Sequence, residues 1–252
     1  MKRLHLTPTS PAENLAADEA VLDWCESGAG EETLMFWEPR DNFVVVGYAN
    51  KVATEVNVSA CEAKGIPIFR RCSGGGTVVQ MAGGLNYSLI LRIDANAPTR
   101  NITSANQFIM EKNRAAIETE FRDQNSEARI SVNGYTDLAL ATHHSSPITA
   151  KKFAGNSQRR RKNFLLFHGT LLLNCDLNLI SELLLMPSLQ PDYRASRSHA
   201  DFLTNLNLST EKIKAALAKE WNATEELENP LRKEISQLAR EKYSPREWSF
   251  KF

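Results

Sequence analysis

A nine-residue stretch with a period of two constrains the fold more than any other part of this sequence. In residues 85–93 apolar side chains occupy every odd position, so that Leu85, Tyr87, Leu89, Leu91 and Ile93 alternate with Asn86, Ser88 and Arg92. Successive side chains of a β-strand point to opposite faces of its sheet, so this pattern predicts a half-buried strand. The chain is therefore expected to contain a β-sheet.

Helices are predicted between the strands, without the regular alternation of a doubly wound sheet. Ser10 and Glu13 form a capping box that predicts a helix over residues 11–25, and Ser104 and Gln107 form another. The fold class predicted is α+β, with one mixed, largely antiparallel sheet flanked by helices. Further strands are expected over residues 33–37, 43–47, 66–71, 77–80, 129–133, 137–141 and 164–173, and further helices over residues 59–64, 179–185, 211–221 and 231–243.

Composition limits the class of function. The 252 residues are 42% hydrophobic and 24% charged, which is typical of a globular protein. Lysine plus arginine numbers 30, as does aspartate plus glutamate, so the net charge of zero does not indicate nucleic acid or an anionic membrane as a partner. No apolar stretch approaches the about 18 residues of a membrane helix, and the basic start lacks the apolar segment of a secretory signal. We expect a cytoplasmic protein.

The cysteines and one histidine pair do not indicate a metal site. The four cysteines are far apart and form no C-x-x-C pair, so a structural zinc is not expected and the thiols should be free in a reducing compartment. They are Cys25, Cys61, Cys72 and Cys175. The pair His143 and His144, in a polar loop over residues 143–147, has no further ligands nearby in the sequence.

The segment R-R-C-S-G-G-G, residues 70–76, carries most of the chemical information. Consecutive glycines allow a ligand to approach the backbone closely, and their amides can face one anion. Two preceding arginines add donors suited to phosphate or carboxylate. The segment is neither a P-loop nor a dinucleotide-binding loop, and the alternative is a glycine hairpin beside solvated arginines. The predicted ligand-binding residues here are Arg70, Arg71, Ser73, Gly74, Gly75 and Gly76.

A lysine near glycine and asparagine forms a second unit. Lys152, followed by Gly155 and Asn156, is interpreted as a cation placed over a backbone turn, although most lysines are solvated. The basic run over residues 159–162 predicts a solvated, mobile loop, or else an arm that meets phosphate or an acidic partner.

Two single residues complete the candidates. Asp137 ends the turn G-Y-T-D and opens an apolar strand, and the alternative is an ordinary turn aspartate. His168 lies in F-H-G-T-L, and an isolated histidine is more often structural than a ligand or a base.

Taken in order, these motifs resemble the lipoate–protein ligase and octanoyltransferase family. Residues 14–20 look like its N-L-A-x-D-E-A motif, and residues 70–88 like its R-R-x-S-G-G-G-x-V-x-H-x-x-G-x-L-N-Y-S signature. Residues 152–158 resemble K-[IF]-[SA]-G-[NS]-[AS]-Q, and residues 168–172 match H-G-T-L-L. Residues 242–248 are similar to the segment that closes the ligase catalytic domain. The matches span nearly the whole chain, which makes their combination specific.

The resemblance implies a fold like that of class II aminoacyl-tRNA synthetases and biotin–protein ligase, with the site over the glycine loop. It implies that lipoate and ATP, with Mg²⁺, give lipoyl-adenylate. The acyl group then passes to one lysine of a lipoyl domain, in a 2-oxoacid dehydrogenase or in the glycine cleavage H protein. Residues 1–252 would form a single catalytic domain without the C-terminal accessory domain of large ligases. Some members supply that domain separately, so an accessory protein is a further expected partner.

The resemblance also implies roles for single residues. Lys152, rather than Lys151, would lie by the acyl carboxylate and the α-phosphate and later polarise the carbonyl that the acceptor lysine attacks. Asp137 matches the family's N-D pair and is the expected Mg²⁺ ligand. The other residues expected to bind substrate or nucleotide are Arg70, Arg71, Ser73, Gly74, Gly75, Gly76, Asn86, Gly155, Asn156, His168 and Thr170.

Departures from the family pattern keep two alternatives open. Gln80 stands where histidine is usual, Met81 where aspartate is common, and Thr136 where asparagine is usual. One alternative is an octanoyltransferase, which needs no ATP and carries the acyl group on a cysteine. Cys72, beside two arginines, is the only cysteine in a motif, where its thiolate would be favoured, although a packing role is preferred. The other alternative is a binder of lipoate or of a lipoyl domain without catalysis.

Overall fold

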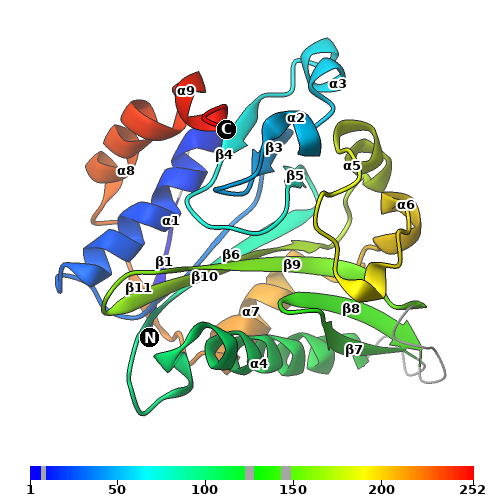
Figure 1. Cartoon of the computed structure of the whole chain (residues 1–252). Coiled ribbons are helices and arrows are strands. Elements are labelled where there is room, and N and C mark those ends of the chain that lie inside the picture. Colours follow the sequence, from blue (N-terminus) through cyan, green and yellow to red (C-terminus); the bar gives the residue numbers. More distant parts are fainter. Residues whose placement is uncertain (7–9, 123–127, 143–148) are drawn as a thin grey trace.

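The computed structural model describes residues 1–6, 10–122, 128–142 and 149–252, so the His143–His144 pair lies outside the described residues. Two β-sheets form the framework (Figure 1). The large sheet has the strand order β11-β1-β2-β6-β10-β9-β8-β7 and the small sheet the order β4-β3-β5. The strands are β1 (Lys2–Leu4), β2 (Thr33–Trp37), β3 (Phe43–Val46), β4 (Ile68–Arg70), β5 (Val78–Gln80), β6 (Gly84–Arg92), β7 (Ala128–Asn133), β8 (Asp137–Thr142), β9 (Lys151–Arg160), β10 (Phe164–Leu172) and β11 (Glu225–Leu227).

The large sheet is mixed and largely antiparallel, as predicted. Strand β1 pairs in parallel with β2 and β11, whereas every other pairing in this sheet is antiparallel. The prediction of a single sheet is wrong, because β3, β4 and β5 form a sheet of their own. Strands β1 and β11 were not expected, since three residues are too few to show a period.

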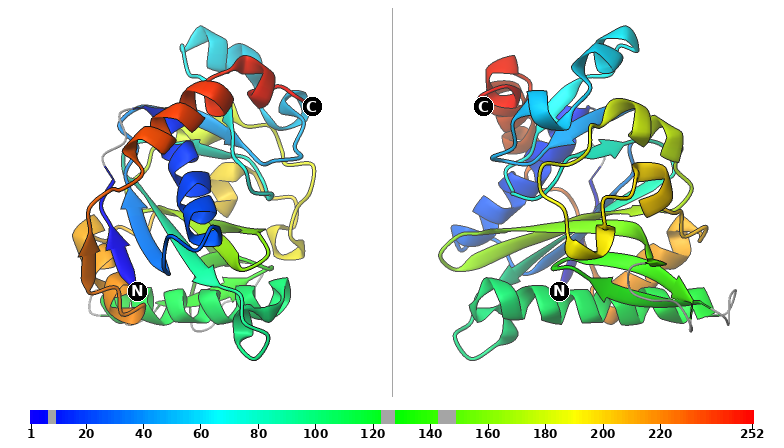
Figure 2. Two further views of the ribbon diagram at one scale, coloured as in Figure 1. Left: turned by 90° about the vertical axis from the view of Figure 1, so that its left-hand side faces the viewer. Right: turned by 45° about the vertical axis from the view of Figure 1, so that its right-hand side comes forward.

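Helices cover both faces of the large sheet, with α4 along one face and α1 on the other (Figures 1 and 2). The helices are α1 (Pro11–Glu26), α2 (Val52–Glu55), α3 (Val58–Ala63), α4 (Ile102–Arg122), α5 (Leu177–Leu183), α6 (His199–Phe202), α7 (Thr210–Glu220), α8 (Arg232–Leu238) and α9 (Arg246–Ser249), with a π-helical turn at Ala239–Tyr243. Of the helices in the described ranges, none combines the length and apolarity that crossing a bilayer requires.

Strand β6 is buried on both faces, so the prediction of a half-buried strand is wrong. Its odd residues, such as Leu85 and Leu89, pack in one cluster with α4 and α7. Its even residues face α1 and the small sheet, where Ser88 and Asn86 are buried but hydrogen-bonded. The period of two is thus correct, but the polar face is covered because its polar groups find partners inside the protein.

Two predicted helix starts have different outcomes. Ser10 caps α1, because its Oγ accepts a hydrogen bond from the Glu13 amide at 3.3 Å. Ser104 does not cap α4. It lies in the first turn, where its amide donates to Oδ1 of Asn101 at 2.9 Å, so Asn101 acts as the cap.

Residues 151–160 form one continuous strand, so the predicted turn over Lys152 is wrong, and the predicted solvated loop at 159–162 is wrong for residues 159–160, which belong to the strand. Arg159 Nη1 donates to the carbonyl oxygen of Cys72 at 2.6 Å, and Arg161 Nε donates to Oδ1 of Asp23 at 2.8 Å. Arg159 and Arg161 are therefore bonded within the protein, whereas Lys162 is exposed.

Candidate active site

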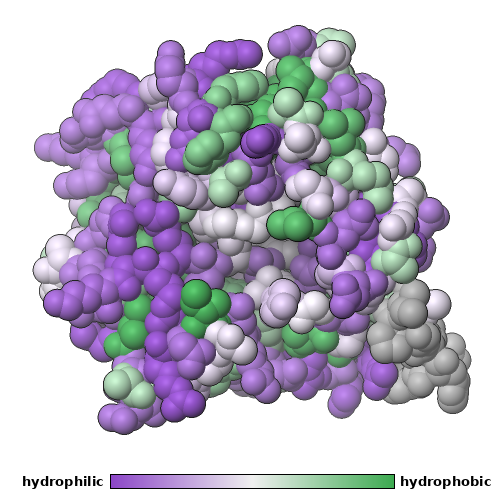
Figure 3. All heavy atoms as spheres, in the orientation of Figure 1, coloured by the Kyte–Doolittle hydropathy of each residue, from purple (hydrophilic) through white to green (hydrophobic). Residues whose placement is uncertain are grey.

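A cavity of about 480 Å³ lies between the large sheet, the small sheet and the segment 184–203. It opens near the middle of the face shown in Figure 3. Most of the predicted site residues line it. They are Arg71, Gly75, Gly76, Asn86, Asp137, Lys152, Gly155, Asn156, His168 and Thr170. The predicted residues that do not line it are Arg70, Ser73 and Gly74.

Lys152 reaches the cavity from β9 and forms an ion pair there. Its Nζ lies 2.8 Å from Oδ1 of Asp137, and the hydroxyl of Tyr193 donates to Oδ2 of Asp137 at 2.8 Å. Gly155 provides the space for this amine, because a Cβ at that position would lie 2.8 Å from Nζ of Lys152. Burial and the Asp137 charge raise the pKa of Tyr193, so its hydroxyl keeps the proton that it donates.

The surroundings of Asp137 do not fit a resident magnesium ion. Both carboxylate oxygens already accept, one from Lys152 and one from Tyr193. In the parts of the chain that the structure describes, no three histidine, cysteine, aspartate or glutamate side chains gather closely enough to hold a metal. Magnesium is consequently considered below only as part of an ATP complex, in which phosphates supply most of the ligands.

Arg71 folds the glycine loop upon itself. Its Nε donates to the carbonyl oxygen of Gly74 at 3.1 Å, and its Nη2 donates to that of Gly76 at 2.7 Å. Ser157 Oγ also donates to the Gly74 carbonyl, at 2.8 Å. Burial lowers the pKa of Arg71 to about 10, which leaves the guanidinium charged at neutral pH. No described residue accepts from the amides of Gly74, Gly75 or Gly76, so these donors are available to an anion.

Arg70 has a structural place rather than the predicted ligand-binding one. Its side chain is fully buried, and Nη1 donates to the carbonyl oxygens of Gly47 and Asn50, both at 2.8 Å. Its Nη2 donates to the carbonyl oxygen of Ser249 at 2.7 Å. Arg70 therefore joins the loop after β3 to the C-terminal segment, and its donors point away from the cavity because these carbonyls hold them.

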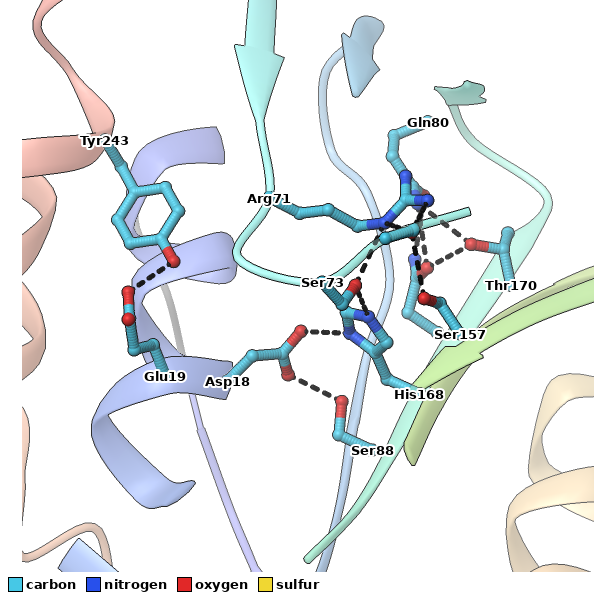
Figure 4. Close-up of polar contacts among 12 residues, drawn as sticks. Asp18, Glu19, Arg71, Ser73, Gln80, Ser88, Ser157, His168, Thr170 and Tyr243 are labelled. Atoms are coloured by element: carbon cyan, nitrogen blue, oxygen red, sulfur yellow. Dashed lines mark hydrogen bonds and ion pairs between the residues drawn. The ribbon is translucent and has the colours of Figure 1, made fainter. Parts of the chain in front are cut away.

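A chain of hydrogen bonds runs beneath the glycine loop (Figure 4). Arg71 Nε lies 3.1 Å from Ser73 Oγ, which lies 2.5 Å from Nε2 of His168, and Nδ1 of His168 lies 2.6 Å from Oδ2 of Asp18. Ser88 Oγ donates to the other oxygen of Asp18 at 2.6 Å. Because arginine can only donate, Ser73 accepts from Arg71, and His168 then links Ser73 to Asp18.

The departure at Gln80 is compensated within the cavity wall. Gln80 Nε2 donates to Oδ1 of Asn86 and to Oγ1 of Thr170, both at 2.9 Å, and Asn86 returns a bond to Gln80 at 2.8 Å. The amide pair and the hydroxyl thus satisfy one another. Met81, the second departure, is buried in the apolar cluster of the small sheet.

Asn156 lines the cavity, but its side chain is directed to the α4 face of the sheet. Its Nδ2 lies 3.5 Å from Sδ of Met110 in α4 and donates to the carbonyl oxygen of Thr136 at 2.7 Å, while Oδ1 accepts from Tyr87. Its side-chain amide is therefore engaged in hydrogen bonds within the protein, and substrate binding by Asn156 stays a prediction.

All four cysteines lie in described parts of the chain, and none of them lines the cavity. Cys72 packs against α1, and burial, followed by the charges of Glu19 and Asp18, raises the pKa of its thiol to about 12. The expectation that neighbouring arginines favour its thiolate is wrong, because both guanidiniums are turned to backbone carbonyls.

Residues 184–203 form a wall of the cavity that no sequence motif predicted. Phe202 and Leu203 of this segment line the cavity with apolar surface, and Tyr193 donates to Asp137 beside it. Glu55 of α2, also missed, is buried in this wall and accepts from the amide of Ser188 at 3.3 Å. Neither helical nor strand periodicity marks this segment, so only its position in the fold identifies it.

Comparisons with known proteins show which family this chain belongs to. The family model for the lipoyl protein ligase A/B catalytic domain matches residues 10–222. Octanoyltransferase LipM of Geobacillus kaustophilus is 29% identical over 96% of this chain and 94% of its own. Lipoate-protein ligase A subunit 1 of Thermoplasma acidophilum is 25% identical over 96% and 93%.

Solved structures show the same fold. A lipoate-protein ligase A bound with ATP is 26% identical, with a TM-score of 0.73 over 99% of this chain and 98% of that one. The bi-partite lipoate protein ligase of Thermoplasma acidophilum has a TM-score of 0.78 at 24% identity, over 99% and 95%. Because the family model matches most of the chain, the chain belongs to the lipoyl protein ligase A/B catalytic domain family.

Proposed function

We propose that this protein attaches lipoate to a lysine of lipoyl-domain proteins in an ATP-dependent reaction that proceeds through lipoyl-adenylate. The observation that carries the proposal is that the cavity offers an amine and no thiol. Lys152 reaches into it, whereas the four cysteines are buried elsewhere. A ligase needs a cation at the reacting carboxylate, whereas a thioester-forming transferase needs a reactive cysteine.

In the first step, the lipoate carboxylate attacks the α-phosphorus of ATP, and pyrophosphate leaves. The charge that develops on the phosphoryl oxygens needs fixed donors and cations. Lys152 supplies a cation from β9, and the free amides of Gly75 and Gly76 supply donors from the facing loop. Magnesium enters with ATP as part of the substrate. The apolar side chains of Leu15, Trp37 and Val45 provide surface suited to the acyl chain.

In the second step, the neutral ε-amine of the acceptor lysine attacks the acyl carbonyl carbon, the bond to the phosphate oxygen breaks, and AMP leaves. Lys152 holds the developing negative charge on the carbonyl oxygen. Because acyl-adenylates react with water, the walls around Lys152 also serve to exclude it. Tyr193 contributes here by holding Asp137 beside Lys152.

An octanoyltransferase is the second candidate, because relatives named octanoyltransferase LipM match nearly the whole chain. It would move an octanoyl group from a thioester donor to the same acceptor lysine. The buried, protonated thiols argue against a cysteine carrier in this chain.

One experiment separates these activities. The protein is incubated with an apo lipoyl domain and either lipoate with MgATP or octanoyl-acyl carrier protein, and the acceptor is weighed by mass spectrometry. We expect a lipoyl mass increase only with ATP. An increase only with the acyl carrier protein would establish the transferase instead. The relative in Thermoplasma acidophilum is named as subunit 1 of its ligase, so a further arm of the experiment adds an accessory protein. No increase in any arm would leave a non-catalytic binder.

A further inference from the structure

A second chain of hydrogen bonds runs along the face of the large sheet that α4 covers, from the end of α7 to the turn before Asp137. Trp221 Nε1 donates to Oδ1 of Asn113 at 2.7 Å, and Asn113 Nδ2 donates to the hydroxyl of Tyr87 at 2.8 Å. The Tyr87 hydroxyl donates to Oδ1 of Asn156 at 2.6 Å, and Asn156 Nδ2 donates to the carbonyl oxygen of Thr136 at 2.7 Å. We call these four bonds the Trp221 chain.

The donor at its start sets the direction of the whole chain. An indole N–H can only donate, so the carbonyl of the Asn113 amide must face Trp221 and its NH₂ must face Tyr87. The hydroxyl of Tyr87 accepts that bond and therefore gives its own hydrogen to Asn156. The amide of Asn156 is in turn oriented with its NH₂ toward the Thr136 carbonyl.

The Trp221 chain has no competing solvent over most of its length. Trp221 is 8% exposed, Asn113 1% and Tyr87 2%. Burial raises the pKa of Tyr87, so its hydroxyl stays protonated and remains a donor. A buried polar group without its partner is costly, and linked hydrogen bonds reinforce one another in such surroundings. Each member therefore depends on its neighbours for its orientation.

The chain ends where the backbone ladder is irregular. Strands β8 and β9 pair Asp137 with Gly155 and Ala139 with Lys152, with a register shift between Leu138 and Ala139. Such an irregularity bends a strand and re-aims its side chains, so the placement of Asp137 against Lys152 differs from that in a regular ladder. Two hydrogen bonds between Asn156 and Thr136 stabilise this end of the β8–β9 pairing, because Thr136 Oγ1 also donates to the carbonyl oxygen of Asn156 at 2.8 Å.

We infer that Trp221, Asn113 and Tyr87 are positioning residues for Lys152, and that they act through Asn156 and the turn that carries Asp137. For catalysis the inference rests on the proposed function, since it assigns Lys152 to the reacting carbonyl. Trp221 lies outside every motif of the family resemblance, and its ring packs against Phe108 far along the chain from the glycine loop. Its place in the chain follows from the fold alone.

The test is a double-mutant cycle with Trp221→Phe and Tyr87→Phe, measured as kcat and KM for ATP-dependent lipoylation. We expect each single variant to lower kcat roughly tenfold with KM within twofold, since small misplacements of reacting groups are costly. Residues of one network are not additive, so the double variant should be no slower than Tyr87→Phe. A hundredfold loss in the double variant would overturn the inference. Asn113→Asp, which keeps the volume but removes the donor, replaces Tyr87→Phe if that variant does not fold.

A readout without catalysis separates this inference from the proposed function. The rate at which an acetylating N-hydroxysuccinimide ester modifies Lys152 is followed by peptide mass spectrometry. We expect it to rise severalfold in Trp221→Phe, because the amine is released from Asp137. The matched control is Leu217→Val, which removes one methylene from the same helix without touching a polar group. Unchanged reactivity in Trp221→Phe, or an equal rise in the control, would refute the positioning role whatever reaction the enzyme catalyses.

Discussion

The arginines of the glycine loop and Lys152 of strand β9 use their positive charges in opposite ways. The loop motif carries two guanidiniums, and both donate to backbone carbonyl oxygens, Arg70 to Gly47 and Ser249 and Arg71 to Gly76. Strand β9 brings one ammonium group into the cavity, where Lys152 has one carboxylate partner. The density of charge in a motif thus does not identify the reacting group. The reacting group is identified instead by how few hydrogen-bonding partners the fold already supplies to it.

The chemistry of the two cations explains the difference. A guanidinium presents five N–H donors in a rigid fork, so it can satisfy several carbonyls that no secondary structure pairs. An ammonium group is a compact charge on a flexible stem and can stay beside a reacting atom. Arg71 arranges the loop so that its amides are free, and Lys152 faces them across the cavity. The arginine shapes the anion site, and the lysine supplies the charge.

The largest effect is expected from Lys152→Ala. It removes the cation at the reacting carbonyl, so ATP-dependent lipoylation should fall by on the order of 10³-fold. The measurement is the initial rate of acceptor modification by mass spectrometry, alongside lipoate binding, which should persist. Lys151→Ala is the matched control, because this exposed neighbour does not line the cavity and should keep full activity. Equal losses in both variants would contradict the assignment to Lys152.

Arg70→Lys tests the other side of the comparison. A lysine cannot reach the carbonyls of Gly47, Asn50 and Ser249 together, so buried acceptors lose their partner. We expect the free energy of unfolding to fall by roughly 3 kcal/mol, measured by urea denaturation. The activity per folded molecule should stay within about twofold of the parent. A normal stability with a large loss of activity would return Arg70 to the substrate site.

These two regions also show how far the sequence could predict the molecule. Local signals identified most elements, because a cap such as Ser10 and a period of two depend on neighbours within a few residues. The motifs likewise identified Lys152 and Asp137, which the fold brings together from adjacent strands. Their contact needs only the pairing of β8 with β9, which connects nearby parts of the chain.

What could not be predicted depends on contacts between distant parts of the chain. Arg70 is held by Ser249, 179 residues later, and no local pattern encodes that contact. Tyr193 lies in an irregular segment and meets Asp137 only when that segment folds over the sheet. Asn156 looked like a ligand in its motif, yet the fold turns its side chain to Tyr87. In each case the residue type was informative, but its partner was set by tertiary packing.

The wall opposite Lys152 should make stability depend on pH through His199. Burial, together with the charge of Arg194, lowers the pKa of His199 from 6.5 to about 4. Between these values the unfolded chain binds the proton and the folded protein does not, so this group's contribution to stability is lost as the pH falls from 6.5 toward 4. We expect a loss of roughly 2 kcal/mol from this residue, after allowance for partial solvent screening. The melting temperature of His199→Gln should therefore vary less with pH than that of the parent in this window. An equal pH dependence in both proteins would contradict the assignment.

Gly155→Ala should separate the placement of Lys152 from the fold. The added methyl group would lie 2.8 Å from Nζ and 2.9 Å from Cε of Lys152, which must move away. Because these atoms are the end of a flexible side chain, the melting temperature should change little, whereas kcat should fall about tenfold. Gly65→Ala is a control of the opposite kind, since an added Cβ has open space there but the positive φ of 64° disfavours alanine. That variant should have a lower melting temperature and an unchanged kcat. If both variants changed melting temperature and kcat in the same way, the separate role of Gly155 in placing Lys152 would be refuted.

The smallest effect is expected from Cys72→Ser, which tests whether the glycine loop carries a nucleophile. Cys72 is 2% exposed, and burial raises the pKa of its thiol to about 12, so the native protein at pH 8 should resist alkylation by iodoacetamide at this position. Serine is smaller and more polar, so a modest stability loss is expected from packing, measured by urea denaturation. The rate of ATP-dependent lipoylation should stay within about twofold of the parent. If the parent protein transferred octanoyl groups and a folded Cys72→Ser variant did not, the loop would have to open to expose this thiol. The reacting groups would then include a cysteine as well as Lys152.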